Sequence, residues 1–218
     1  MNVPKIVAVA LAVAGSFAML TALPVRADDS ADAGNSWLVR VRAISLEPAN
    51  QSSANPTLSV PANAITINSK IIPDLDLSYF FSDPHLAAEL VLTYPQLQSV
   101  YFQGGLIGTF DHLPPSLMAQ YHLSPGAAFQ PYVGVGVNET LIRNASLNVG
   151  GVGALHLDSS STGIAYQVGA DLKSGQRHVI NIDAKYINIA SGVYAGSTKV
   201  STATINPWLF GVGYGFRI

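Results

Sequence analysis

Ten charged residues of this chain lie within otherwise apolar segments, several of them two positions apart. Alternate side chains of an extended strand point to the same face, so Arg40 with Arg42, or Asp183 with Lys185, would present two charges on one side. Five of the ten are basic and five are acidic, and such balance is expected inside a protein because an unpaired buried charge is costly. The sequence therefore predicts an internal ion-pair network, a polar plug. Its predicted members are Arg40, Arg42, Asp74, Asp76, Glu89, Asp171, Lys173, Asp183, Lys185 and Arg217.

Catalytic and metal-binding chemistry has much weaker support. His122 and Ser124 have the spacing of a hydrolase pair, but no carboxylate is evidently placed to orient the imidazole. His156 and Asp158 offer two ligands to a divalent ion, which is too few for a site. The chain has no cysteine, and its glycine-rich runs lack the lysine and helix of a phosphate loop. We predict no enzymatic activity, no metal site and no cofactor.

The composition is too apolar for an ordinary soluble surface. Charged residues make up 11% of the 218 residues, against roughly 25% in typical soluble domains, and the mean hydropathy is +0.31. The net charge of −2 gives no basic patch, so we expect no nucleic-acid partner.

The N-terminus has the features of an export signal. A basic start, an apolar run and small residues at Val25 and Ala27 predict a cleaved signal peptide over residues 1–27. No other stretch is long and apolar enough to cross a membrane as a helix. A hydrophobic exported protein then has one main alternative, a closed β-barrel, formed here by residues 28–218.

Strand-like segments and the connections between them support an all-β fold. Short turns rich in Gly, Pro, Ser or Asp alternate with connections of 13 to 24 residues, a sorting by length that a soluble β-sandwich does not require. It predicts an eight-stranded antiparallel up-and-down transmembrane β-barrel with short periplasmic turns and long extracellular loops. The predicted strands are residues 36–47, 65–81, 86–94, 111–123, 129–138, 163–173, 179–190 and 204–218.

Several stretches also resemble a known family, the OmpW outer-membrane proteins, which include the AlkL-type hydrocarbon uptake proteins. The resemblance covers nearly all of residues 28–218. It implies an eight-stranded barrel in the bacterial outer membrane that passes small hydrophobic compounds. In such barrels the last strand guides insertion by the barrel-assembly machinery, here through Tyr214, Phe216 and a terminal Ile218 where Phe is usual. The stretches concerned are WLVRVRAISLEP, IIPDLDLSYFFSD, LAAELVLTYP, LPPSLMAQYHL, FQPYVGVGVNET and INPWLFGVGYGFRI.

The inward-facing residues divide by height along the strands. Most of the charges fall in the periplasmic half, and apolar residues follow above them. We therefore predict passive carriage of small hydrophobic solutes through an apolar upper lumen, with lateral release into the membrane because the plug lies below. The alternative is a structural barrel whose loops bind lipopolysaccharide, a phage or a bacteriocin. The predicted apolar path is Ile44, Leu46, Val91, Pro114, Met118, Ile187, Ile189 and Leu209.

Overall fold

The computed structural model describes residues 36–218, and the predicted signal segment, residues 1–27, lies outside the described residues. Within this range the chain forms one 15-stranded sheet in which every paired strand is antiparallel to its neighbours. No helix in the described range is long and apolar enough to cross a membrane.

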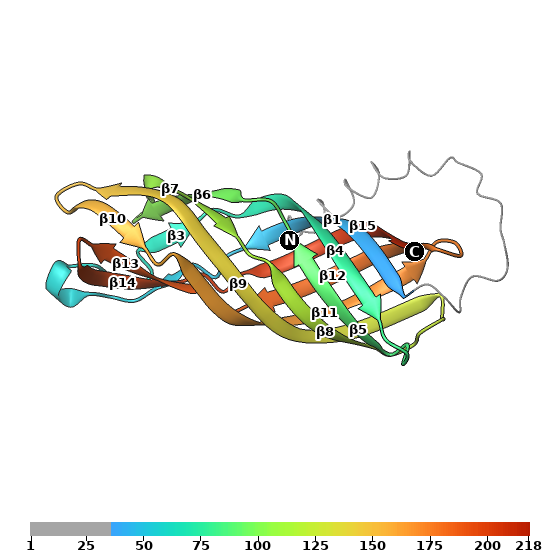
Figure 1. The fold of residues 1–218 in the computed structure, drawn as a ribbon. Helices are drawn as coiled ribbons and strands as arrows, with labels where there is room; N and C mark the ends of the chain where they lie inside the picture. The colour runs from blue at the N-terminus through green and yellow to red at the C-terminus, as the bar shows by residue number, and fades with distance from the viewer. Residues whose placement is uncertain (1–35) are drawn as a thin grey trace, which may run out of the picture.

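Eight of the strands close into a barrel, which confirms the predicted fold class. The ring runs β1-β4-β5-β8-β9-β11-β12-β15, and the pairing of β15 with β1 closes it. Figure 1 shows these strands side by side at the end of the molecule that carries the C-terminus. Their bounds are β1 Trp37–Glu47, β4 Lys70–Phe80, β5 Leu86–Leu92, β8 Ser116–His122, β9 Phe129–Val149, β11 Ser160–Lys173, β12 His178–Ile187 and β15 Trp208–Arg217.

Alternation of side chains sorts each barrel strand into an inner and an outer face. In β1 the inward Arg40 and Arg42 are buried, whereas Val41 between them is 49% exposed on the outer surface. Aromatic rings flank this apolar surface at both ends. Trp37 lies 5.0 Å from Tyr79 at the end with the short turns, and at the other end Tyr186 lies 5.2 Å from Trp208 (centroid distances). This is the arrangement of aromatic girdles at two membrane interfaces.

The four long connections are largely β-structure, which the sequence analysis treated as loops. They form hairpins that extend the barrel wall beyond the membrane-spanning ring, at the end opposite the C-terminus in Figure 1. β9 spans both parts, because its 21 residues pair with β8 below and with β7 and β10 above. The extension consists of β2 Gln51–Ser52, the 3-10 helix η2 Pro56–Leu58, β3 Ile65–Ile67, β6 Gln96–Phe102, β7 Gly105–Leu113, β10 Gly153–Leu157, β13 Ala190–Ala195 and β14 Thr198–Thr204.

Several predicted strand boundaries were wrong. The segment 65–81 is two strands, β3 and β4, and the segment 111–123 joins the end of β7 to β8. Pro114 and Pro115 separate the latter pair, because proline has no N–H to donate to a ladder. Conversely, the segment 129–138 is too short, since β9 continues to Val149. The last two segments, 179–190 and 204–218, are too long, since β12 ends at Ile187 and β15 begins at Trp208.

The extension closes on itself through side chains where β2 meets β3. The side-chain amide of Asn50 makes the two hydrogen bonds that a neighbouring strand would make: its oxygen accepts from the Ile67 N–H at 2.7 Å, and its nitrogen donates to the Ile67 carbonyl at 3.1 Å. The hydroxyl of Ser52 accepts from the Ile65 N–H at 3.2 Å. These bonds join the two ends of the extracellular sheet, so its apolar interior is enclosed.

Candidate functional site

The lumen is built in four layers along the barrel axis. Nearest the periplasmic turns lies a small apolar cluster of Leu38, Phe80, Ala87 and Val179. Above it comes the layer of buried charges, and above that a second apolar cluster that includes Ile44 and Leu46. A third apolar cluster fills the extracellular extension. The sequence predicted the charged layer and the apolar layer above it, but not the apolar base beneath.

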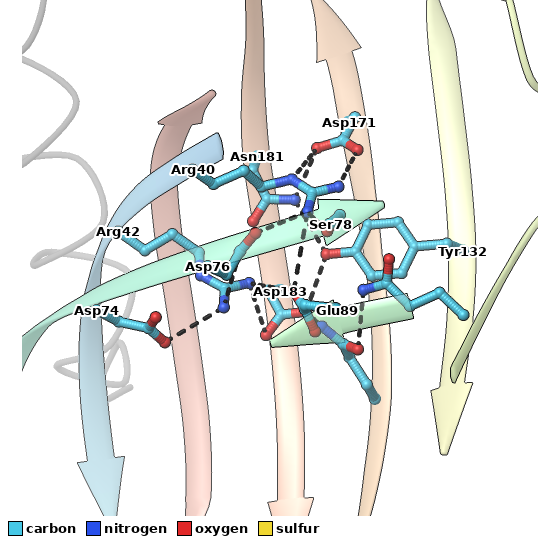
Figure 2. Close-up of polar contacts among 12 residues, drawn as sticks. Arg40, Arg42, Asp74, Asp76, Ser78, Glu89, Tyr132, Asp171, Asn181 and Asp183 are labelled. Atoms are coloured by element: carbon cyan, nitrogen blue, oxygen red, sulfur yellow. Dashed lines mark hydrogen bonds and ion pairs between the residues drawn. The ribbon is translucent and has the colours of Figure 1, made fainter. Parts of the chain in front are cut away.

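Arg40 is the centre of the charged layer. Its guanidinium is fully buried and binds the Asp171 carboxylate through two nitrogens, at 3.0 Å and 2.6 Å. The third nitrogen donates to Asp76 at 2.9 Å and to the Ser78 hydroxyl at 2.7 Å. Figure 2 shows this guanidinium between the two carboxylates. A bidentate, charge-assisted contact of this kind fixes geometry as well as energy.

Arg42 and Lys185 continue the network upward. Arg42 Nη2 lies 2.9 Å from Asp76 and 3.2 Å from Asp74, and its Nη1 lies 3.5 Å from Asp183. Lys185 Nζ donates to Asp183 at 2.7 Å. The plug is therefore one connected set of ion pairs drawn from β1, β4, β5, β11 and β12. The Arg40–Asp171 pair crosses the lumen, because β15 and β12 lie between β1 and β11 in the ring.

Neutral side chains that the sequence analysis did not single out complete the plug. The Tyr132 hydroxyl and the Gln167 amide both donate to Asp183, at 3.0 Å and 2.8 Å. Asn181 donates to Tyr132 and to Asp171, at 3.0 Å and 2.9 Å. The signal was in the alternation, because Asn181 and Gln167 share the inward parity of the charges on their own strands.

Glycines on the inner face of β15 leave space for the two arginine side chains of β1. A Cβ added at Gly213 would collide with the Val41 carbonyl and with Cγ of Arg42, and one added at Gly215 would lie 2.9 Å from Cγ of Arg40. β15 pairs with β1 at these positions. The glycines on the inner face of the last strand are therefore needed because the long side chains of Arg40 and Arg42 on the first strand pack against them.

Two of the ten predicted plug residues, Lys173 and Arg217, lie at the rim and not in the buried layer. Lys173 donates to the Gly126 carbonyl beside a periplasmic turn, and Arg217 stacks on Phe80, 4.4 Å from the ring centroid, and bonds Gln130. Both are only half-buried, at the rim. Their loss leaves three basic groups facing five acidic ones: Arg40, Arg42 and Lys185 against Asp74, Asp76, Glu89, Asp171 and Asp183.

An apolar pocket lies directly above the plug. It has an empty volume of about 730 Å³, part of it open to solvent. Seven of the eight residues of the predicted path line it, and Met118 is buried in the apolar cluster beside it. Asp74 and Lys185 form its floor, where the pocket meets the plug. The seven are Ile44, Leu46, Val91, Pro114, Ile187, Ile189 and Leu209.

A second, smaller apolar cavity leads outward from this pocket. Its empty volume is about 390 Å³, and it lies inside the extracellular extension. Ile67, Phe110, Ile142 and Ile205 line both spaces and form the boundary between them. Phe110 and the polar pocket residues Gln98 and His112 come from the β6–β7 hairpin, which the sequence analysis had assigned mostly to a loop.

The candidate catalytic and metal-binding groups are occupied elsewhere. His122 is buried between the rings of Phe80 and Tyr132, and its Nε2 pairs with Gln120 at 3.2 Å. Asp158 accepts from the Gly192 N–H at 2.6 Å within the extracellular sheet. Among the described residues, 36–218, no group of three His, Cys, Asp or Glu side chains is arranged to hold a metal ion.

A closed antiparallel barrel with an apolar outer surface, two aromatic belts and a polar interior is an outer-membrane β-barrel protein. Comparison with known proteins places it more narrowly: the OmpW family model matches residues 33–218, and the chain belongs to that family.

Individual relatives agree with this assignment. The chain is 36% identical to an uncharacterized outer-membrane protein of Sinorhizobium fredii, y4mB, over 92% of this chain and 88% of the relative. It is 31% identical to outer membrane protein W of Vibrio cholerae, over 92% of this chain and 94% of the relative. The solid-state NMR structure of the outer membrane protein AlkL in lipid bilayers has the same fold, with a TM-score of 0.69 and 21% identity over 90% of this chain and 96% of that chain. The protein is thus a resident of the bacterial outer membrane.

Proposed function

We propose that this barrel passively carries small hydrophobic molecules from outside the cell into the outer membrane. The observation that carries the proposal is the apolar lining of the pocket above the plug, continuous with that of the outer cavity. Pockets with apolar walls and a few polar groups suit small hydrophobic ligands. The resemblance to AlkL-type uptake proteins points to the same class of solute.

The plug favours release through the wall rather than along the axis. An eight-stranded barrel is only wide enough for its own side chains, and here Arg40, Arg42 and their partners fill it. An apolar solute that moved downward would have to displace paired charges. Moving sideways, it would meet lipid.

One part of the wall beside the pocket has a broken hydrogen-bond ladder. The β4–β5 ladder ends at Leu75–Leu92, so the N-terminal part of β4 faces the start of β6 without a continuous ladder. In that interval the Thr93 hydroxyl donates to the Pro73 carbonyl at 2.9 Å, and Lys70 Nζ donates to the Leu97 carbonyl at 3.0 Å. The pocket lining includes residues from both sides of the interruption, among them Ile72, Val91 and Thr93. We propose this interval as the exit.

An uptake assay tests the proposal. Cells lacking and carrying the protein are compared for uptake of a radiolabelled medium-chain alkane, with folding and insertion confirmed for each variant. Leu46→Arg with Leu209→Arg places two charges in the pocket. Leu106→Arg, the control, places one at an exposed position of β7 beside the β6–β7 turn. We expect uptake to rise severalfold with the native protein and the control, and to fall to background with the double variant. No change with folded, inserted native protein contradicts carriage.

The exit is tested separately. Thr93→Trp narrows the interruption, whereas Glu89→Ala opens space in the plug. Lateral release predicts that the first lowers uptake and the second leaves it unchanged. The opposite pattern would indicate axial passage.

Insertion and surroundings complete the proposal. We propose that residues 1–27 direct export, that the barrel-assembly machinery inserts the barrel, and that lipid and lipopolysaccharide surround it. Binding of a phage, a bacteriocin or lipopolysaccharide by the extracellular hairpins is the outcome to pursue if carriage fails.

A further inference from the structure

Two polar side chains that line the apolar pocket hold buried atoms without a hydrogen-bond partner in the described residues. Gln98 is fully buried, and within residues 36–218 neither its amide oxygen nor its amide nitrogen has a hydrogen-bond partner. His112 is 9% exposed, and its Nε2 is likewise without a partner in the described part of the chain. Both residues line the pocket. They are its only lining residues from the β6–β7 hairpin besides Phe110.

The strand register brings these two groups to the same part of the wall. Gln98 pairs across the ladder with Phe110, and Gln96 pairs with His112. Gln98 and His112 are therefore diagonal neighbours on the inner face of this hairpin. Gln96, two residues from Gln98 and equally buried, differs in part. Its amide oxygen also lacks a partner in the described residues, but its amide nitrogen donates to the Tyr94 carbonyl at 3.0 Å, and Gln96 does not line the pocket.

Unpaired polar atoms in an apolar cavity indicate what would fill it. A buried donor or acceptor without a hydrogen bond costs about 1–3 kcal/mol. A pure hydrocarbon in the pocket would leave the Gln98 amide without one. A ligand oxygen restores the bond: a carbonyl accepts from the Gln98 amide nitrogen, and a hydroxyl can also donate to its oxygen. Ligand pockets commonly combine apolar walls with a few such polar groups that orient the ligand.

The charge of the plug restricts the ligand further. The pocket floor includes Asp74, whose Oδ1 has no hydrogen-bond partner in the described residues. The network below it has five acidic groups and three basic ones, and the Lys185 ammonium at the floor is already paired with Asp183 at 2.7 Å. A carboxylate headgroup at the floor would lie near the Asp74 carboxylate and be repelled by it. A neutral oxygen meets no such barrier.

We infer that the pocket selects a neutral hydrophobic molecule with one hydrogen-bonding oxygen, a medium-chain alcohol or ketone, over the matching alkane and carboxylate. The oxygen lies at Gln98 and His112, and the chain lies against Ile44, Val91 and Ile187. This inference rests on the proposed function, since it names the substrate class of the same pocket.

The test is equilibrium binding to the full barrel in lipid vesicles. Radiolabelled 2-octanone, octane and octanoate are each measured with protein-containing and protein-free vesicles, so that partition into lipid is subtracted. A neutral hydrogen bond contributes about 1 kcal/mol, a factor of about five in affinity. We expect 2-octanone to bind about fivefold or more tightly than octane, and octanoate to bind more weakly than 2-octanone.

Matched variants locate the selectivity. Gln98→Leu keeps the approximate shape and removes the polar atoms, so the preference for 2-octanone over octane should fall about fivefold while octane still binds. Gln96→Leu, on the same strand, should leave the preference unchanged. Should Gln98→Leu not fold, the side-chain amide resonances of Gln98 in the native protein provide the readout. We expect them to shift with 2-octanone and not with octane.

Failure of this inference is distinguishable from failure of the carrier function. Octane and 2-octanone binding equally above the lipid background, with the Gln98 amide unchanged, would overturn the ligand class and leave carriage standing. Binding of no solute above background would overturn both.

Discussion

The plug and the pocket are neighbouring parts of one lumen and share several strands, yet their polar side chains are partnered differently. On β1, Arg40 and Arg42 belong to the plug, and the next inward residues, Ile44 and Leu46, line the pocket. In the plug, Arg40 bonds three partners. In the pocket, Gln98 bonds none through its amide within the described residues. The plug pairs its charges with one another, although some of its atoms, such as both Glu89 oxygens, lack hydrogen-bond partners in the described residues. The Gln98 amide has neither kind of partner there, so it can bind a ligand.

This difference separates a structural role from a binding role. A buried ion pair retained by several partners is costly to break from one side, so plug substitutions should act on stability. An apolar pocket with empty space tolerates change more easily, so pocket substitutions should act on solute binding.

Removing the central arginine should have the largest effect. Arg40→Met leaves Asp171 and Asp76 buried without their main partner, so we expect a loss of about 3–5 kcal/mol in the free energy of unfolding. Urea titration of the barrel in vesicles measures it. Lys173→Met removes a basic group of the rim, and its cost should stay below about 1 kcal/mol. Equal costs for the two variants would show that the buried network is not the stabilising one.

Filling the space beside the arginines should cost less. Gly213→Ala forces a Cβ against the Val41 carbonyl and the Arg42 side chain, and overpacking of this kind costs about 1–3 kcal/mol. Gly150→Ala is the matched control, because nothing lies within 4 Å of an added Cβ there. The same unfolding titration compares them. A neutral Gly213→Ala would mean that the plug can shift away from β15.

Opening the extracellular seam should act locally. Asn50→Gly retains the positive φ of 54° at this position but removes the side chain that bonds Ile67. Two neutral hydrogen bonds are worth about 1–2 kcal/mol together. We therefore expect hydrogen exchange at the Ile67 amide to accelerate about tenfold while Leu38 and Val41 amides in β1 are unaffected. Unchanged exchange at Ile67 would show that the seam is held by other contacts.

Neutralising an excess acid in the plug should have the smallest effect. Both oxygens of Glu89 lack hydrogen-bond partners in the described chain, and its nearest charges, Arg40 and Arg42, are 3.8 Å and 3.6 Å away. Glu89→Gln should change the free energy of unfolding by less than about 1 kcal/mol, because it removes repulsion along with attraction. Asp171→Asn breaks the bidentate contact and should cost about 3 kcal/mol. A large loss from Glu89→Gln would show that all five acids are needed.

The sequence predicted the ring because two local rules determine it. Alternation placed Arg40, Val41 and Arg42 on their correct faces, and the short turns marked where strands reverse. The strands of the extracellular extension were not predicted, because its hairpins are short. Their turns, such as Gln103-Gly104, lie within stretches whose composition also suits loops. Pro114 and Pro115 were the available signal for the break between β7 and β8.

The sequence predicted which residues face the lumen better than it predicted their positions along the barrel axis. Parity identified Ile44 and Asp183 as inward, but parity does not say how far along the axis a strand end reaches. Lys173 and Arg217 share the inward parity and still lie at the rim, because barrel stagger sets the height of each residue. Gln98 was missed because it fell in the predicted loop between strands 86–94 and 111–123. His112 fell inside the predicted strand 111–123, near its end, and was given no role in the lumen.

The most direct test of the account is to find where a solute resides. An octane carrying a diazirine group is photolysed with the barrel in vesicles, and mass spectrometry locates the attached carbon chains. The account predicts labels on Ile44, Val91 or Ile187 in the native protein, and their loss when Leu46→Arg and Leu209→Arg occupy the pocket. Labels confined to outward side chains such as Val41 and Leu117 would contradict it, since the solute would then be in the lipid and not in the lumen.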